Sequence, residues 1–269
     1  MAKRIRDAIV QLPSMGRWNA AAWIAAALLA MLDARLAALP LAAFGAMCLG
    51  AAFRPGSSFF LPVISRGVSG RSAVALTFDD GPDPLTTPEL LRLLARHGAP
   101  ATFFVTGERV RRHPELVGAI LAAGHTVANH SYRHDPLGAF RRTRTIAAEI
   151  TATQQALMAL GVEPLAYRPP MGITSPRLRP AVAGAGLIVV NFSCRAWDGG
   201  NRRIHNLAAR ILKRVRANDI LLLHEHLLDP AQLPEWAAEM ESVLRGLRAG
   251  KLEIIPLAEL IGRPVMRRV

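Results

Sequence analysis

Two adjacent carboxylates, Asp79 and Asp80, follow the apolar run 73–78 and precede a Gly81-Pro82 turn. A run of this length and composition predicts a buried strand. Neighbouring side chains on a strand point to opposite faces, so we expect the two acids to have different roles. One can hold a cation while the other faces a substrate, and a nearby positive charge is needed because adjacent buried carboxylates repel each other. The alternative is an ordinary turn cap, since Asp and Gly are common in turns.

Two histidines, His130 and His134, follow a second strand-like run at 126–129. Residues four apart face the same side of a helical turn and can bind one cation through their imidazole nitrogens. With Asp80 they would form a site of two histidines and one carboxylate, which leaves positions open for water and substrate. Such a set suits zinc and other divalent transition metals. This spacing is also common by chance, so a purely structural role is the alternative.

Three further groups of polar residues follow later strand-like runs. An arginine can neutralise a carboxylate or lie on the surface, prolines stiffen the chain, and glycine lets the backbone approach a ligand. A histidine that ends a run of leucines is more often a packed core residue than a catalyst. The three groups are Arg168-Pro169-Pro170-Met171-Gly172, Trp197-Asp198-Gly199 and Leu221-Leu222-Leu223-His224.

The elements that position these residues alternate along the chain. Strands are expected at 73–78, 101–105, 126–129, 165–168, 187–192, 220–224 and 252–255. Helices are expected at 88–97, 114–123, 142–160, 175–185, 204–217 and 234–249. The alternation predicts parallel strands joined by crossover helices, either as an open sheet or as a closed barrel. In such folds the chemistry collects at the C-terminal ends of the strands, where these polar residues fall.

The N-terminal segment, 1–53, has a different character. A basic leader precedes two apolar runs, 18–32 and 36–53, which would measure roughly 22 and 27 Å as helices against about 30 Å of hydrocarbon. A helical hairpin with both ends on the cytoplasmic side, a single anchor with the rest of the chain outside the cell, a cleaved signal peptide and a soluble amphipathic helix pair all fit this pattern. Residues 54–72 are turn-rich and indicate a linker.

Composition narrows the partners. The 269 residues carry a net charge of +13, which can attract nucleic acid, an anionic membrane surface or an acidic glycan. No zinc-finger spacing or long basic helix supports nucleic acid, and no nucleic-acid partner is expected. The two cysteines, Cys48 and Cys194, do not indicate a disulfide framework, because Cys48 lies inside an apolar run.

In order and placement, the motifs resemble those of the polysaccharide deacetylases, the NodB-type domain of carbohydrate esterase family 4. The resemblance covers about 73–262 and leaves out the N-terminal segment and a basic tail, 263–269. The matching pieces are Thr77-Phe78-Asp79-Asp80-Gly81, His130-Ser131-x-x-His134, Arg168-Pro169-Pro170, Asp198 and Leu222-x-His224. The family implies a distorted (β/α) barrel of about seven parallel strands, here preceded by an apolar helical anchor.

The resemblance also implies a role for each matched residue in metal-dependent amide hydrolysis. Asp80, His130 and His134 would hold one divalent cation, with zinc first and cobalt, nickel and manganese as alternatives. Asp79 would be the general base and His224 the acid that protonates the leaving amine. Asp198 would orient His224, and Arg168 would hold Asp79. The remaining family positions would line the substrate and oxyanion region: Pro169, Pro170, Met171, Trp197 and Leu222.

The sequence departs from the family beside the groove rather than at the metal. Met171 stands where an aromatic residue is frequent, and Arg195 and Gly199 replace an acid and a tryptophan of the fourth motif. Fewer aromatic platforms put a long polymeric substrate in doubt. We therefore expect deacetylation of an amino sugar in a glycan. One alternative is deacetylation or deformylation of a lipid-linked sugar or glycolipid at a bacterial-type inner membrane; the sequence does not indicate on which side of the membrane the domain lies. The other alternative is a non-catalytic glycan-binding module.

Overall fold

The computed structural model describes residues 14–269 of the chain. Its strands are β1 (Val63–Ile64), β2 (Ala73–Asp79), β3 (Ala101–Val105), β4 (Thr126–Asn129), β5 (Val162–Pro164), β6 (Ala166–Tyr167), β7 (Ile188–Val190), β8 (Cys194–Arg195), β9 (Ile220–His224), β10 (Glu253–Ile254) and β11 (Met266–Arg268). Its α-helices are α2 (Met15–Ala30), α3 (Ala38–Ala52), α4 (Thr86–Arg96), α5 (Gly107–Arg112), α6 (Pro114–Ala122), α7 (Thr143–Met158), α8 (Leu178–Gly184), α9 (Leu207–Leu212), α10 (Leu233–Ala249) and α11 (Leu257–Ile261). Short 3₁₀ turns η1 (Ala34–Ala37), η2 (Gly138–Phe140), η3 (Pro170–Gly172) and η4 (Pro230–Gln232) complete the elements.

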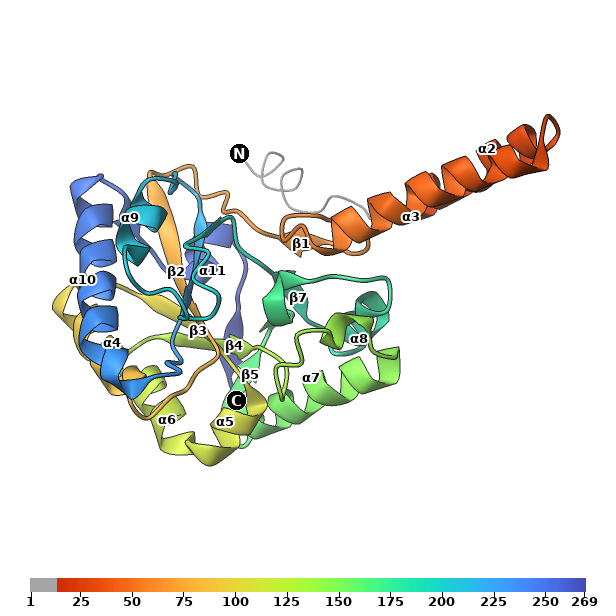
Figure 1. The fold of residues 1–269 in the computed structure, drawn as a ribbon. Helices are drawn as coiled ribbons and strands as arrows, with labels where there is room; N and C mark the ends of the chain where they lie inside the picture. The colour runs from red at the N-terminus through yellow and green to blue at the C-terminus, as the bar shows by residue number, and fades with distance from the viewer. Residues whose placement is uncertain (1–13) are drawn as a thin grey trace.

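A curled sheet of parallel strands forms the centre of the molecule (Figure 1). Its strand order is β1-β7-β6-β4-β3-β2-β9-β8, and β10 also pairs with β2. The strands β1 and β8 end this path and are not paired with each other, so the barrel is open on one side. The predicted α/β barrel is confirmed in this open form. The sheet has nine strands rather than about seven because the very short strands β1 and β8 extend it.

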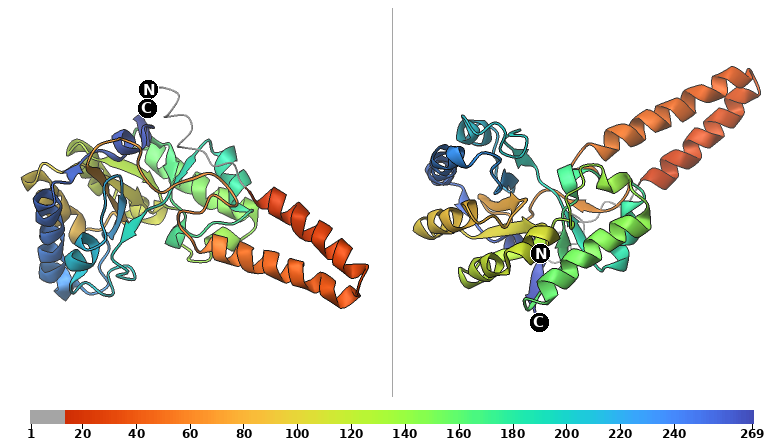
Figure 2. Two further views of the ribbon diagram at one scale, coloured as in Figure 1. Left: turned by 90° about the horizontal axis from the view of Figure 1, so that it is seen from above. Right: turned by 60° about the horizontal axis from the view of Figure 1, so that its bottom comes forward.

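The central strands are buried along their whole length. Every residue of β2 and β3 is buried, as are the first four of β9, and helices such as α4 and α10 cover the outside of the sheet (Figure 2). Trp236 of α10 is fully buried in the largest apolar cluster. Burial on both faces explains why these strands are continuous apolar runs rather than alternating patterns.

The strands with long apolar runs agree well with the sequence-based prediction. The predicted ranges 101–105, 126–129 and 220–224 coincide with β3, β4 and β9. The strands β1, β5, β8 and β11 were not predicted, because two or three residues are too few to show a strand pattern, and α5 and α11 were not, because fewer than two helical turns show no clear period.

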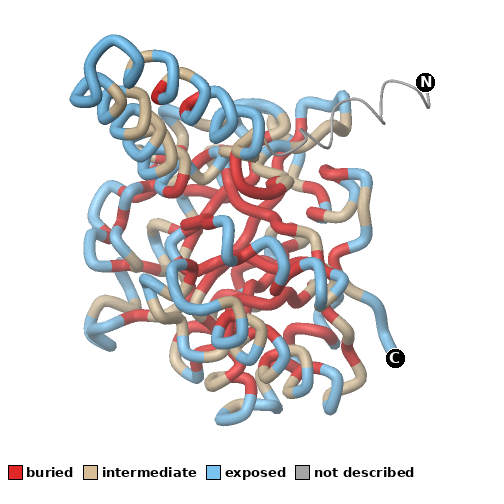
Figure 3. The backbone as a smooth tube through the Cα atoms, turned by 90° about the vertical axis from the view of Figure 1, so that its right-hand side faces the viewer, coloured by how far each residue is buried: buried red, intermediate tan, exposed pale blue. Residues whose placement is uncertain are grey.

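The N-terminal helices α2 and α3 form an antiparallel hairpin that projects from the body of the molecule (Figures 1 and 2). Asp33 begins the connecting turn η1, where its side chain accepts a hydrogen bond from the Arg35 amide at 2.8 Å. Only the base of the hairpin is packed, against Phe59, Phe60 and neighbouring apolar residues. Most of its surface is exposed (Figure 3), including Leu32 at 80% and Met31 at 83%. Among the described residues, one helical stretch, Ala34–Ala52, is long and apolar enough to cross a membrane.

Candidate metal centre and active site

The parallel sheet brings the predicted site residues to one edge. Asp79 ends β2, His130 directly follows β4, and His224 ends β9. Asp79 and His224 are register partners on neighbouring strands, so their side chains lie on the same face. Asp80 has a φ of 73°, a left-handed conformation that turns the chain directly after the strand. Because β2 ends at Asp79, strand alternation does not separate the two carboxylates as expected, and both lie beside His130 Nε2.

Asp80, His130 and His134 form the candidate metal centre. One ligand atom from each lies within 4.8 Å of the others. The Oδ1 atom of Asp80 is 3.5 Å from Nε2 of His130 and 3.3 Å from Nε2 of His134. Asp79 lies beside this set, with Oδ2 3.6 Å from the same His130 nitrogen. The three predicted ligands therefore meet, with the second carboxylate next to them.

The donors of this centre fit a divalent cation. Nδ1 of His130 donates a hydrogen bond to the Arg168 carbonyl oxygen at 2.8 Å, so the lone pair of the neutral ring is on Nε2, which faces Asp80. Asp80 Oδ1 is buried and accepts no hydrogen bond. Burial raises the pKa of Asp80, but the His130 and His134 rings outweigh it and hold that pKa well below its usual value. An ionised carboxylate oxygen without a donor, faced by imidazole nitrogens, is the environment that a cation satisfies.

The pKa values of the two histidines shift in opposite directions. Burial and the neighbouring His130 lower the pKa of His134, which favours the neutral ring that a metal requires. Burial alone would lower the pKa of His130, but the charges of Asp79 and Asp80 raise it. The two carboxylates thus attract positive charge to the point where the three ligand atoms meet.

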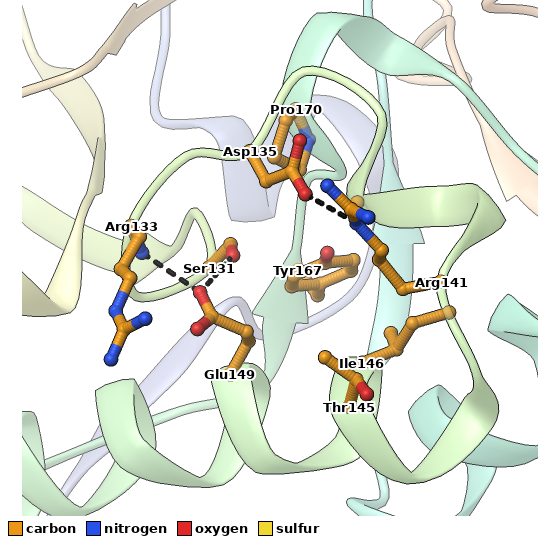
Figure 4. A pocket seen from close by; sticks show the side chains of 10 residues that line it. Ser131, Arg133, Asp135, Arg141, Thr145, Ile146, Glu149, Tyr167 and Pro170 are labelled. Atoms are coloured by element: carbon orange, nitrogen blue, oxygen red, sulfur yellow. Dashed lines mark hydrogen bonds and ion pairs between the residues drawn. The ribbon is translucent and has the colours of Figure 1, made fainter.

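The histidine pair lies on a loop, not on a helical turn as the spacing suggested. Ser131 and His134 have left-handed φ angles of 70° and 55°, which no helix allows. Glu149 of α7 holds the loop by accepting hydrogen bonds from Ser131 Oγ at 3.1 Å and from the Arg133 amide at 2.8 Å (Figure 4). These side-chain contacts replace helical hydrogen bonds and still bring both imidazoles to Asp80.

A cavity of about 390 Å³ lies behind this loop (Figure 4). It is lined by polar side chains, among them Arg141, whose Nε donates to Asp135 Oδ2 at 2.7 Å, and by Tyr167 from the sheet. None of the three candidate metal ligands lines it. We therefore assign the chemistry to the strand ends and not to this cavity.

Arg168 supplies the positive charge that the paired carboxylates need. Its side chain is fully buried, and Nη1 donates to Asp79 Oδ1 at 2.6 Å and to Thr77 Oγ1 at 2.8 Å. The guanidinium also lies 3.8 Å from the centre of the Phe104 ring. This arrangement fixes the orientation of Asp79, with its second oxygen toward the metal centre.

His224 forms a second acid–base pair with Asp198. Nδ1 of His224 donates to Asp198 Oδ2 at 2.8 Å, which leaves Nε2 for another partner. Burial lowers the pKa of His224, but the hydrogen bond to Asp198 and the charges of Asp198, Asp80 and Asp79 outweigh it and raise that pKa to about 9. These carboxylates therefore favour the protonated form of His224, which can donate a proton.

The residues predicted to contact substrate lie in different environments. Pro169, Pro170 and Leu222 are buried, and Leu222 is only 6% exposed. Met171 and Trp197 are exposed, and both have left-handed backbones, with φ angles of 59° and 58°. The left-handed conformation at Met171 belongs to the tight turn η3 that follows Arg168.

Sequence reasoning assigned no role to three residues that support the site. Thr77 accepts from Arg168 and donates to the Leu221 carbonyl oxygen at 2.6 Å, which connects β2 to β9. Glu149 holds the histidine loop but comes 15 residues after His134, without any local signal. Glu225 is fully buried behind Gly81 and accepts a hydrogen bond from Thr87. Its acidic side chain directly after His224 was the one visible sign.

Comparison with known proteins gives a consistent result. The family model described as polysaccharide deacetylase matches residues 66–190. A chitooligosaccharide deacetylase of Sinorhizobium fredii is 37% identical over 62% of this chain and 78% of its own length. A peptidoglycan-N-acetylglucosamine deacetylase of Bacillus cereus is 31% identical over 70% of this chain and 87% of its own length.

Solved structures show the same likeness. A family 4 carbohydrate esterase from Streptomyces lividans, crystallised with acetate, is 32% identical and has a TM-score of 0.62 over 72% of this chain and 96% of its own. A crystallised peptidoglycan N-acetylglucosamine deacetylase is 26% identical, with a TM-score of 0.69 over 76% and 95% of the two chains.

Proposed function

This chain belongs to the polysaccharide deacetylase family, carbohydrate esterase family 4, and we propose that the site described above hydrolyses the N-acetyl group of an amino sugar in a glycan, releasing acetate. The chain is a carbohydrate N-deacetylase, and its family is metal-dependent. The observation that carries the residue assignment is the convergence of Asp80, His130 and His134 beside Asp79 at the strand ends.

The divalent cation of this site, which we propose to be zinc, would be held by Asp80, His130 and His134 and would polarise the amide carbonyl and acidify water. Cobalt, nickel and manganese accept the same donors. Asp79 takes a proton from the attacking water, and Arg168 keeps its carboxylate pointing toward that water. The charge that Arg168 provides also lowers the cost of placing two carboxylates side by side.

His224 completes the reaction as the acid. An amine leaves an amide readily only when it is protonated, and the protonated Nε2 of His224 can supply that proton. Asp198 holds the ring through Nδ1 and stabilises its positive charge. We assign the backbone N–H of Met171 to the oxyanion and the side chain of Leu222 to the acetyl methyl group. Pro169, Pro170 and Trp197 shape the remaining wall of the substrate site.

We further propose that the α2–α3 hairpin attaches the enzyme to a membrane. Its exposed apolar surface, for example Trp23 at 60% and Leu28 at 61%, has no partner within the part of the chain that the structure describes. An exposed apolar surface of this kind marks a protein or membrane contact. The same surface favours a second candidate substrate, a lipid-linked sugar or glycolipid that carries an acetyl or formyl group on nitrogen.

Product analysis tests the function. The metal-loaded chain is incubated separately with N-acetylglucosamine oligomers and with a membrane glycolipid extract, and released acetate and formate are measured. Acetate from the oligomers supports the glycan substrate, and acetate or formate only from the extract supports the lipid-linked one. Release from neither, with the metal bound, would overturn both candidates.

A further inference from the structure

The open side of the barrel contains a cavity whose arginines have no role in the proposed reaction. It has a volume of about 460 Å³ and lies between the segments that follow α3 and β1 and the segment that runs through β8. These segments border β1 and β8, the two edge strands of the sheet, which are not paired with each other. The cavity therefore occupies the gap in the barrel beside the base of the helical hairpin, and it extends from Arg66, which is paired with Asp219 before β9, to Trp197, which precedes Asp198.

Four arginines line this cavity, and none of its lining residues is acidic. Arg66 is paired with the buried Asp219 at 2.5 Å. Arg54, Arg195 and Arg214 form no ion pair among the residues the structure describes. Asp198, the acid nearest Arg195 in the chain, is bound to His224. The cavity thus holds an excess of positive charge without a partner.

Arg195 is held in place by aromatic rings. Its guanidinium carbon lies 3.4 Å from the centre of the Trp197 ring and 5.5 Å from that of Phe192. Stacking of this kind uses the flat face of the guanidinium and leaves the N–H groups at its edge for a ligand. This residue replaces an acid that is frequent in the family's fourth motif, so the substitution reverses the charge of this wall.

The cavity adjoins the active site. Phe192, beneath Arg195, also lies 5.7 Å from the guanidinium carbon of Arg168, which holds Asp79. Trp197 is the residue before Asp198. On the opposite wall, Arg54 comes two residues after the end of α3. A molecule that extends from the apolar hairpin toward Asp198 would therefore pass Arg54 and Arg195.

We propose that this cavity binds a phosphate-type anion of the substrate, carried between the amino sugar and its anchor. The inference rests on the proposed deacetylation and narrows its substrate to a sugar linked through a phosphate ester. Guanidinium groups match phosphate oxygens in pairs, and several of them suit the charge of a phosphate better than that of one carboxylate. The adjacent hairpin indicates a lipid as the group beyond the phosphate.

The test compares substrates that differ only in this anion. Acetate release is measured with a neutral N-acetylglucosamine oligomer, a soluble N-acetylglucosamine 1-phosphate and a polyprenyl-phosphate-linked N-acetylglucosamine in detergent. The Arg54→Gln/Arg214→Gln double variant is compared with Arg245→Gln, which removes an exposed arginine of α10. We expect the double variant to raise KM for the phosphate-bearing substrates by about tenfold or more, while kcat and the neutral substrate are unaffected.

The arms separate the possible results. If the double variant has a raised KM for both phosphate substrates, the cavity recognises the phosphate alone. If its KM is raised only for the lipid-linked substrate, the cavity recognises the phosphate together with the lipid. An equal effect on the neutral substrate, no effect on any substrate, or the same effect in Arg245→Gln overturns the proposal. If the wild-type chain releases no acetate, the deacetylase function fails, and calorimetric titration with pyrophosphate still tests the cavity. Pyrophosphate binding to the wild type that is lost in the double variant supports the anion site. Absence of pyrophosphate binding to the wild type overturns it.

Discussion

At the scale of single residues, the site gives two neighbouring carboxylates, Asp79 and Asp80, different partners. Asp79 and Asp80 are neighbours in the chain, yet one is bonded to Arg168 and the other faces two imidazoles. Two adjacent carboxylates repel each other; Arg168 compensates the charge of Asp79, and the cation proposed on Asp80 would compensate the other. Those different partners support the proposed roles, with Asp79 as the base and Asp80 as a metal ligand.

Replacement of Asp79 by asparagine tests the base. We expect Asp79→Asn to lower kcat by about 10²–10⁴-fold, because an amide cannot accept the proton of the attacking water. The metal content should remain, since Asp79 is not one of the three ligands. Full activity of the metal-loaded variant would remove the assignment.

The proposed role of His224 as the acid predicts how activity depends on pH on the alkaline side of the profile. His224 must carry a proton to release the amine, so activity should fall as pH rises through its pKa, which Asp198 and the site carboxylates raise to about 9. A cation on Asp80 cancels part of this attraction, so we expect the limb at or below that value. In Asp198→Asn the limb should move to lower pH, in a plot of log kcat/KM against pH. A limb that stays in place would show that Asp198 does not tune His224.

At the scale of elements, the end of β9 is packed against the turn after β2. Glu225 lies directly behind Gly81, where an added Cβ would come within 1.7 Å of Oε2. Its backbone N–H donates to the Asp79 carbonyl oxygen at 3.0 Å. Side chain and backbone of one residue thus hold the strand end that carries both carboxylates.

This packing predicts a pH-dependent stability. Burial raises the pKa of Glu225 to about 8 from an ordinary value of 4.5. Between these values the folded chain keeps a proton that the unfolded chain has lost, so the free energy of unfolding should fall as pH rises from about 4.5 to about 8. Glu225→Gln, which is neutral throughout, should lack this part of the dependence. Thermal unfolding at several pH values measures the difference between the two proteins, and a difference independent of pH would contradict the prediction.

The hairpin gives a second prediction at this scale. The wild-type chain should co-sediment with vesicles that contain anionic lipid, through the exposed apolar surface of α2 and α3. Trp23→Glu/Leu28→Glu should reduce that binding strongly, because both side chains are exposed on α2. Met158→Glu, on an exposed apolar residue of α7, is the matched control and should bind as the wild type does. Wild-type protein that stays in the supernatant would contradict the membrane proposal.

Elements and site were predictable to different degrees, for physical reasons. The buried strands 101–105, 126–129 and 220–224 were predicted to the residue, because a turn-forming residue, Pro100, Gly124 or Asp219, stands just before each of them. The conformation of the loop around His134 was not, because it depends on left-handed residues and on Glu149, whose contact is made only in the folded chain. The histidines could still be assigned by the family motif, although the helical turn expected from their spacing was wrong.

At the scale of the whole molecule, the open barrel explains how one chain can combine a polar reaction with an apolar attachment. The C-terminal ends of the strands carry the proposed catalytic side chains. The hairpin leaves the body beside β1, which is an edge strand of the sheet (Figure 1). The arginine-lined cavity lies between them. The net charge of +13 favours an anionic surface, which agrees with a substrate presented at a membrane.

The metal content of the purified chain tests the central claim most directly. Elemental analysis after loading and exhaustive dialysis should find one divalent cation per chain in the wild type and in His205→Ala, an exposed histidine outside the site. His130→Ala should lose that cation together with deacetylase activity, because it removes one of three protein ligands. An unchanged metal content in His130→Ala would contradict the account, since Asp80, His130 and His134 would then not be the metal site.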